Sequence, residues 1–281
     1  MRNSTIFNAT VFLCLVFSSA ISARKLTFIS WNIRDFGGSR SDAEIELIAD
    51  VLAHADIIAI QEVVARDPAG AKAVARLVNA LNRKGSSWDY RISDPTIYTS
   101  PQKVEKYAFV WKASQIQVIG GRPTLIKELA HTVEREPYLI SFRMGQKELS
   151  ILNYHACTHT KEFPERDEIM HISRWIMNQN MSNVIFAGDM NLVIQDEAFR
   201  QLKQNAYSHA LNGEKTTLKK ECSDGDYLSS AEDNILYKFS NLKYQSSKVI
   251  DFVGKLRCES VKQKSVMLSD HLAVELIFTL M

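Results

Sequence analysis

The chain has 281 residues, of which 46% are hydrophobic and 23% charged, and its formal net charge is +2 at pH 7. This length and apolar content are enough for a large core, and the mixed signs of charge argue against intrinsic disorder. The charge is too balanced to indicate a polyanion partner by itself, so binding to nucleic acid would need a local basic cluster.

The first 23 residues are typical of a secretory signal peptide. Arg2 precedes an apolar run at residues 11–17, and small residues at 18–23 offer a cleavage site. The apolar run is well short of the roughly 20 residues that a membrane-spanning helix needs. We therefore expect residues 1–23 to be a signal peptide and residues 24–281 to be one secreted or periplasmic domain with no stable membrane anchor. The alternatives are an uncleaved anchor and a wrongly assigned start.

Short apolar runs alternate with amphipathic segments along the rest of the chain, which indicates buried strands alternating with helices. Ser41 with Glu44 is a candidate capping box for the first helix, and Pro68 and Pro164 are candidates for opening the second and third. The polar stretch 212–230 predicts a long loop. Strands are predicted at residues 26–30, 56–60, 90–92, 107–111, 116–119, 138–142, 149–154, 184–189, 234–239, 248–253 and 272–278, and helices at 41–54, 68–81, 164–177 and 197–204. This order, without repeats or linkers, predicts a single layered α/β domain.

Acidic, amide and histidine residues stand at the ends of five of the predicted strands. Such positions lie at the rim of a sheet, where clefts form. Carboxylate and amide oxygens suit magnesium, calcium or manganese, and histidines beside them suit proton transfer. The residues expected to meet are Asn32, Glu62, His155, Asp189, Asn191, Asp270 and His271. This combination predicts metal-assisted hydrolysis, with a phosphate ester as the favoured substrate.

Taken together and in order, the motifs around these residues resemble the endonuclease/exonuclease/phosphatase superfamily, and most closely its deoxyribonuclease I group. Each motif is weak alone, but the resemblance covers nearly all of residues 24–281. The motifs are Trp31-Asn32-Ile33-Arg34-Asp35-Phe36-Gly37, Gln61-Glu62-Val63, residues 105–109, Arg135-Glu136-Pro137, His155, Gly188-Asp189-Met190-Asn191 and Ser269-Asp270-His271. The resemblance implies a four-layer α/β sandwich, in which two packed mixed β-sheets are flanked by helices and the active site lies at one rim.

The resemblance also implies a role for each motif residue. Glu62 would hold a divalent cation, with Asn32 and Asp270 nearby; Mg²⁺ is the favoured ion, and Mn²⁺ and Ca²⁺ are alternatives. Asp189 and Asn191 would orient the scissile phosphate and the attacking water. His155 paired with Glu105, and His271 paired with Asp233, would serve as the acid and the base. Arg135 would contact the phosphate and Arg34 the DNA.

The expected activity is that of a secreted, divalent-metal-dependent endonuclease that cleaves DNA with low sequence specificity. RNA is a further candidate substrate, and the protein is expected to be a monomer. Two alternatives stay open. One keeps the fold and acts as a phosphomonoesterase or phospholipid phosphodiesterase; the other is a binding protein on an inactive scaffold. Taken singly, the residues also allow structural roles: His155 as a core histidine, or Arg135 paired on the surface with Glu134 or Glu136.

The chain departs from the family at positions that would contact DNA. The family has an arginine directly after the segment that matches Val63, whereas here Val64 and Ala65 come before Arg66. A preference for duplex DNA is therefore not predicted. Further candidates for contacts with the nucleic-acid backbone are Lys103, Lys106, Lys112 and Arg122.

Three cysteines follow the predicted signal peptide. A disulfide between Cys222 and Cys258 is plausible in an oxidising compartment. Cys157 lies two residues after His155. It is either a nucleophile or a small buried side chain, and the second interpretation is favoured because free cysteines are commonly buried.

Overall fold

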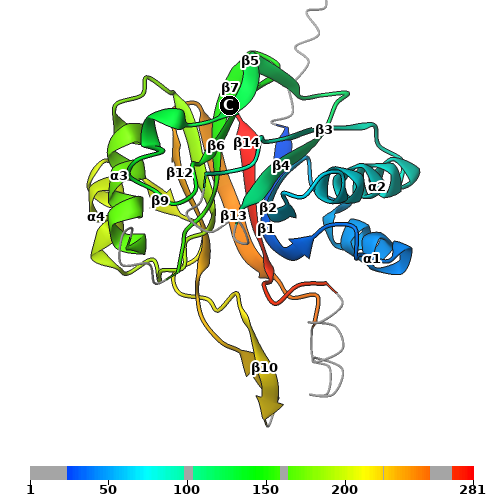
Figure 1. Cartoon of the computed structure of the whole chain (residues 1–281). Helices are drawn as coiled ribbons and strands as arrows, with labels where there is room; N and C mark the ends of the chain where they lie inside the picture. The colour runs from blue at the N-terminus through cyan, green and yellow to red at the C-terminus, as the bar shows by residue number, and fades with distance from the viewer. Residues whose placement is uncertain (1–23, 98–103, 159–163, 224, 254–267) are drawn as a thin grey trace, which may run out of the picture.

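The fold is a sandwich of two six-stranded β-sheets with helices on both outer faces (Figure 1). The computed structural model describes residues 24–97, 104–158, 164–223, 225–253 and 268–281, so the predicted signal peptide lies outside the described residues. Each sheet contains one parallel strand pair and otherwise antiparallel pairs. The predicted four-layer α/β sandwich of mixed sheets is therefore confirmed.

The first sheet holds the N-terminal and C-terminal strands. Its order is β13 (Leu242–Ile250), β14 (Ala273–Leu280), β1 (Lys25–Phe36), β2 (Ile57–Val64), β4 (Glu105–Lys112) and β3 (Trp88–Ile92), with β1 and β2 parallel. Helices α1 (Asp42–Leu52) and α2 (Ala69–Arg83) cover its outer face. The predicted capping box is present: the Glu44 amide donates to Ser41 Oγ, and the Ser41 amide donates to the Glu44 carboxylate.

The second sheet has the order β5 (Gln117–Leu125), β6 (Tyr138–Met144), β7 (Lys147–His155), β8 (Asn183–Asp189), β12 (Asp233–Phe239) and β9 (Ser208–His209). Strands β7 and β8 are parallel and are joined through α3 (Glu165–Met177). Helix α3, the 3₁₀ turn η3 (Glu197–Phe199) and α4 (Arg200–Gln204) cover its outer face, and another 3₁₀ turn, η2 (Lys127–Leu129), precedes β6. Buried Ile169, Ile172 and Ile176 of α3 share one apolar cluster with Leu152 and Phe186 of the sheet.

The inner faces of the two sheets form the central core, and a polar network crosses it near the active site. Phe109 of β4 stacks on Tyr138 of β6, with ring centroids 5.3 Å apart. Closer to the rim, Gln61 Nε2 donates to Asn153 Oδ1 at 2.6 Å, and Asn153 Nδ2 donates to the Ile60 carbonyl at 3.0 Å. All three residues are buried. This network ties β2 to β7 and so fixes the rims of the two sheets relative to each other.

A two-stranded hairpin projects from the sandwich (Figure 1). It consists of β10 (Leu218–Ser223) and β11 (Asp226–Leu228), so the prediction of a loop at 212–230 is wrong there. The hairpin is held by contacts that are distant in sequence: Leu218 packs with Val253 and Leu272. Because the segment itself is polar and short, its local sequence pattern does not predict the two strands.

Two observations concern export and the cysteines. No helix in the described ranges is long and apolar enough to cross a membrane. Cys258 lies outside the described residues, so its pairing with Cys222 stays a prediction. Cys157 is buried, as the favoured interpretation expected.

Candidate active site

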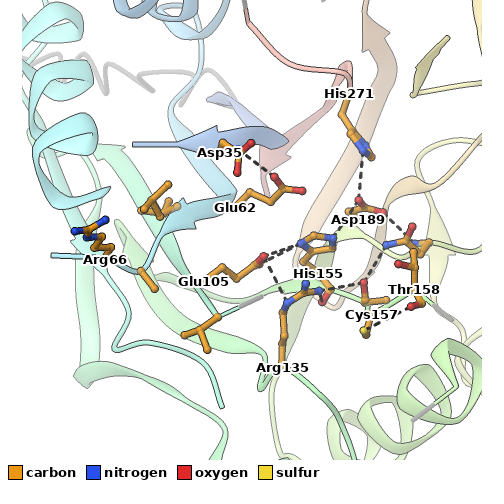
Figure 2. A pocket seen from close by; sticks show the side chains of 16 residues that line it. Asp35, Glu62, Arg66, Glu105, Arg135, His155, Cys157, Thr158, Asp189 and His271 are labelled. Atoms are coloured by element: carbon orange, nitrogen blue, oxygen red, sulfur yellow. Dashed lines mark hydrogen bonds and ion pairs between the residues drawn. The ribbon is translucent and has the colours of Figure 1, made fainter. Parts of the chain in front are cut away.

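A cleft of about 520 Å³ opens at the rim where β2, β7 and β8 end (Figure 2). Residues from both sheets line it, including most of the predicted site. The lining residues used below are Asp35, Glu62, Arg66, Glu105, Arg135, His155, Cys157, Asp189, Asn191 and His271. The structure thus brings most of the residues from the strand-end pattern together in one cleft, because chain segments far apart in sequence end at one rim.

The backbone is strained at this rim. Positive φ angles occur at Asp35 (47°), Glu62 (58°) and Asn191 (49°), and all three residues line the cleft. A left-handed conformation outside glycine costs on the order of 1–3 kcal/mol and is concentrated at functional sites. Gly188 has φ 143°, and a Cβ there would lie 1.7 Å from the Tyr154 carbonyl oxygen. Glycine therefore allows the end of β8 to approach β7, which brings Asp189 beside His155.

His155 and Glu105 form the first buried histidine–carboxylate pair. His155 Nδ1 lies 3.1 and 3.0 Å from the two carboxylate oxygens of Glu105, and His155 Nε2 lies 3.5 Å from Asp189 Oδ2. Burial alone would lower the pKa of His155, but the Glu105 carboxylate outweighs it, so the pKa is raised. The Tyr107 hydroxyl accepts a hydrogen bond from the His155 amide at 3.3 Å.

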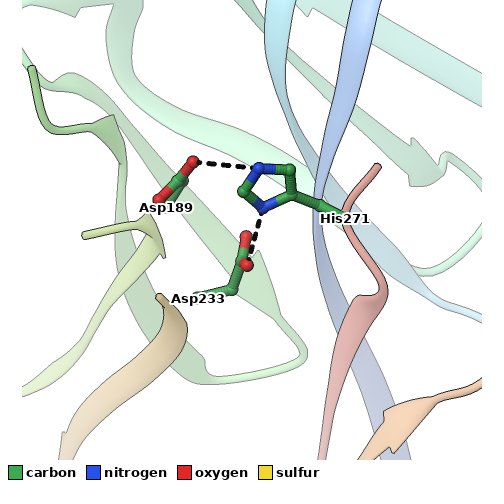
Figure 3. A group of neighbouring side chains, drawn as sticks. All are labelled: Asp189, Asp233 and His271. Atoms are coloured by element: carbon green, nitrogen blue, oxygen red, sulfur yellow. Dashed lines mark hydrogen bonds and ion pairs between the residues drawn. The ribbon is translucent and has the colours of Figure 1, made fainter. Parts of the chain in front are cut away.

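His271 and Asp233 form the second pair (Figure 3), and His271 lies on the other side of Asp189 from His155 (Figure 2). His271 Nδ1 lies 2.8 Å from Asp233 Oδ2, and His271 Nε2 lies 3.6 Å from Asp189 Oδ2. Burial opposes the charged imidazole, but the carboxylates of Asp233 and Asp189 dominate and hold the pKa of His271 well above its ordinary value. Asp233 therefore lies beside His271, as predicted.

Asp189 stands between the two imidazoles. The same oxygen, Oδ2, faces both Nε2 atoms and also accepts a hydrogen bond from Asn32 Nδ2 at 3.0 Å. Burial would raise the pKa of Asp189, but the two histidines lower it on balance. Its other oxygen, Oδ1, accepts from the Asn191 amide at 3.0 Å, while Asn191 Nδ2 donates to the Ala156 carbonyl at 2.9 Å. Asp189 and Asn191 are thus held at the centre of the cleft, where the reacting group would lie.

Arg135 is buried beside the first pair and is not exposed at the surface. Its Nε lies 3.5 Å from Glu105 Oε2, and its Nη1 donates to the His155 and Ala156 carbonyls at 3.3 and 3.4 Å. Burial raises the pKa of Glu105, but Arg135 and then His155 lower it below its ordinary value. Arg135 therefore keeps Glu105 ionised and holds the backbone at the end of β7, while its side chain also lines the cleft.

The residues at the end of β1 and β2 fit a hard divalent cation. Glu62 Oε1 accepts from Asn32 Nδ2 at 3.1 Å, and Glu62 Oε2 accepts from the Asp35 amide at 3.1 Å. The buried Asn32 Oδ1 has no hydrogen-bond donor among the described residues. Because a buried carbonyl oxygen normally has a partner, an oxygen-preferring cation beside Glu62 would satisfy it.

The predicted third ligand, Asp270, lies at the same rim but is engaged otherwise. Asp270 Oδ2 lies 3.5 Å from Arg34 Nη1. The Ser269 hydroxyl donates to the Asn32 carbonyl at 2.7 Å and accepts from the Arg34 and His271 amides, which ties this segment to the end of β1. Asp189, Asp233 and His271 also lie close enough to hold an ion, with ligand atoms within 4.8 Å of one another. In this arrangement they are connected as an ion-paired histidine and two carboxylates (Figure 3).

The residues predicted to contact the nucleic-acid backbone differ in their positions and partners. Lys106 Nζ pairs with Asp67 at 2.7 Å, and Lys112 lies at the far end of β4 from Glu105 and pairs with Asp56. Lys103 lies outside the described residues. Arg66, whose displaced position had counted against DNA contacts, lines the cleft.

Two buried residues of the site were missed. Thr216 donates to Asp233 Oδ2 at 2.7 Å, and it lies in the segment predicted as a plain loop. Glu168 lies on α3 and accepts three hydrogen bonds from residues beside the site. In the sequence both are ordinary polar residues without a motif, so no local signal could have found them.

Known proteins with similar sequences include two deoxyribonucleases. A deoxyribonuclease of Thioalkalivibrio sp. (strain K90mix) is 28% identical over 193 residues, which cover 66% of this chain and 51% of that protein. Deoxyribonuclease-1-like 1 of Cricetulus griseus is 25% identical over 153 residues, which cover 52% of this chain and 48% of that protein. The chain thus spans about half the length of these relatives.

Solved structures of endonuclease/exonuclease/phosphatase family proteins share the fold. The structure of an endonuclease/exonuclease/phosphatase family protein from Bacteroides thetaiotaomicron superposes with a TM-score of 0.65 at 14% identity, covering 92% of this chain and 99% of that one. Residues 29–271, from the first buried strand to the second site histidine, match the Endonuclease/Exonuclease/phosphatase family. Since this match includes most of the chain and every element that carries the site, the protein belongs to the endonuclease/exonuclease/phosphatase family.

Proposed function

We propose that this protein is an exported, divalent-metal-dependent endonuclease that hydrolyses phosphodiester bonds of DNA with little sequence specificity; RNA is the alternative substrate. The single observation that carries the proposal is the convergence of two histidine–carboxylate pairs on Asp189 Oδ2, at 3.5 and 3.6 Å. Hydrolysis of a phosphodiester needs a base for the attacking water and an acid for the leaving oxygen, and this arrangement supplies both. The similarity to two deoxyribonucleases supports nucleic acid as the substrate.

The electrostatics favour a division of roles between the histidines. The pKa of His271 is raised further than that of His155, because Asp233 and Asp189 act on it together whereas Arg135 opposes Glu105 at His155. His271 therefore keeps its proton to higher pH and is suited to protonate the leaving oxygen. His155, with the smaller shift, is suited to accept a proton from water that Asp189 and Asn191 orient.

The predicted cation would be held by Glu62 and Asn32, with Asp270 nearby. When bound it would neutralise charge on the phosphate oxygens, a contribution that typical mutational data place at several kcal/mol for such groups. Arg135, buried beside Glu105, supplies a fixed positive charge in the same cleft. Mg²⁺ is favoured because the available ligand atoms are carboxylate and amide oxygens.

The test is nicking of supercoiled plasmid by purified residues 24–281 with Mg²⁺, with and without EDTA. We expect nicking that EDTA abolishes and that the His155→Ala variant lacks. Single-stranded DNA and RNA in the same assay would rank the substrates. Intact plasmid with Mg²⁺, Mn²⁺ and Ca²⁺ would contradict the proposal; release of phosphate from small phosphomonoesters would then favour the phosphatase alternative.

A further inference from the structure

Glu168 is a fully buried carboxylate that the proposed chemistry does not use. It lies in the first turns of α3, on the face that packs against β7 and β8. Burial raises its pKa, although hydrogen bonds from neighbouring backbone and side chains oppose that effect. A buried carboxylate is costly unless its oxygens are satisfied, so its partners indicate what it is there to hold.

All three partners of Glu168 adjoin residues of the site. Oε1 accepts from the amide of Glu134, the residue before Arg135, at 2.5 Å. Oε2 accepts from the hydroxyl of Tyr154, the residue before His155, at 2.8 Å, and from the amide of Cys157 at 3.1 Å. Glu168 thus holds two chain segments beside the cleft: the one that leads into Arg135 and the one that contains His155.

The side chain of Arg135 completes a hydrogen-bonded frame formed by residues 134–135, 154–157 and Glu168. Its Nη1 donates to the carbonyls of His155 and Ala156, which lie between Tyr154 and Cys157, the two residues that Glu168 Oε2 holds. Asn191 Nδ2 donates to the same Ala156 carbonyl at 2.9 Å. A shift of residues 155–157 would therefore displace Arg135, His155 and Asn191 together.

We propose that Glu168 is a positioning residue of the active site, which sets Arg135 and the end of β7 in register with Asp189 and Asn191. This inference rests on the proposed function for its kinetic consequence, but the geometry it assigns can be measured without activity. A misplacement of about 1 Å in such a frame costs on the order of 100-fold in rate, and binding of a long substrate depends less on it.

The first test is Glu168→Gln, which keeps the volume but replaces one acceptor oxygen by an NH₂ group that faces N–H donors. We expect kcat to fall about 10- to 100-fold with little change in KM. Glu168→Asp, which keeps the charge but retracts it by one methylene, should fall between wild type and Glu168→Gln. The matched control is Ile172→Val on the same buried face of α3, which loosens packing without touching the frame and should leave kcat unchanged.

A double-mutant cycle separates positioning from a general loss of stability. Because Glu168 acts partly through Arg135, Glu168→Gln should cost less activity in an Arg135→Ala background than in wild type, whereas Ile172→Val should leave kcat unchanged in both backgrounds. Additive effects for Glu168 and Arg135, or an equal loss in Ile172→Val, would overturn the inference.

Hydrogen exchange provides the readout that does not depend on activity. In Glu168→Gln, amide exchange should accelerate in peptides covering residues 132–138 and 152–158, while in Ile172→Val it should accelerate in α3 alone. If wild type proves inactive on nucleic acid, the proposed function fails and exchange alone decides the inference. Unchanged exchange at both segments would refute it whatever the activity.

Discussion

The two halves of the active site are built alike but are charged differently. In each half a histidine presents Nδ1 to a carboxylate and Nε2 to the shared Asp189. On the His155 side, the guanidinium of Arg135 contacts the carboxylate of Glu105. On the His271 side, the corresponding contact to Asp233 comes from the neutral hydroxyl of Thr216, at 2.7 Å.

This difference shows how one arrangement, a histidine between two carboxylates, can supply both an acid and a base. The positive charge of Arg135 beside the His155–Glu105 pair disfavours a charged imidazole at His155. The neutral hydroxyl of Thr216 has no such effect, so Asp233 and Asp189 stabilise the charged form of His271. The pKa of His271 is accordingly raised well above its ordinary value, and that of His155 less so. Environments that separate two titratable groups are the usual means by which an acid and a base coexist at one pH.

The largest effect is expected when either imidazole is removed. His155→Ala and His271→Ala should each lower the rate of plasmid nicking by at least about 100-fold, the usual contribution of a general acid or base. His131→Ala is the control, because His131 is exposed and lies away from the cleft lining. Near-normal activity in either site variant would mean that the substituted histidine takes no part in the mechanism.

A pH–rate profile sharpens the comparison. If His155 is the base, activity rises as pH passes its pKa; if His271 is the acid, activity falls as pH passes its higher pKa. Asp233→Asn removes a charge that raises the pKa of His271, so the alkaline limb should move to lower pH. Glu105→Gln should move the acid limb to lower pH for the same reason at His155.

If Asp233→Asn instead moved the acid limb and Glu105→Gln the alkaline limb, the pKa of His155 would be the higher of the two, and the proposed roles would be exchanged. The Glu165→Gln variant, which removes a carboxylate at the start of α3 outside the cleft lining, is a control for nonspecific effects of lost charge.

The parts of this site that could be predicted from sequence are those with a local cause. Apolar runs predicted the strands, and the polar residue at the end of each run predicted the rim, so the sequence placed His155, Asp189 and Glu62 together before the structure showed that they line one cleft. The sandwich itself followed from the resemblance. Thr216 and Glu168 could not be found, because their roles arise from contacts with residues 17 and 34 positions away that no periodicity encodes. The β10–β11 hairpin was missed for the same reason.

Thr216 allows a test confined to one half of the site. Its Oγ1 donates to Asp233 Oδ2 and accepts from the amides of Glu232 and Asp233. Thr216→Val keeps the shape but leaves buried amides without an acceptor, which should lower the free energy of unfolding by about 1–3 kcal/mol. Denaturant unfolding measures this loss. The His155 limb of the pH–rate profile should stay in place, and movement of that limb would show that the two halves are not independent.

The smallest effect is expected at Arg34, which lies outside both buried pairs. Its side chain is 55% exposed and contacts Asp35 and Asp270 at 3.6 and 3.5 Å, so its ion pairs contribute little to stability. If it contacts a phosphate, Arg34→Ala should raise KM a few-fold, leave kcat unchanged and reduce the slope of log KM against log salt concentration by about one. Arg143→Ala is the control, since Arg143 pairs with Glu148 at the end of β7 opposite His155. An unchanged slope with a lower kcat would instead mean that Arg34 acts by orienting Asp270, and the cleft would then bind its substrate through buried charges such as Arg135.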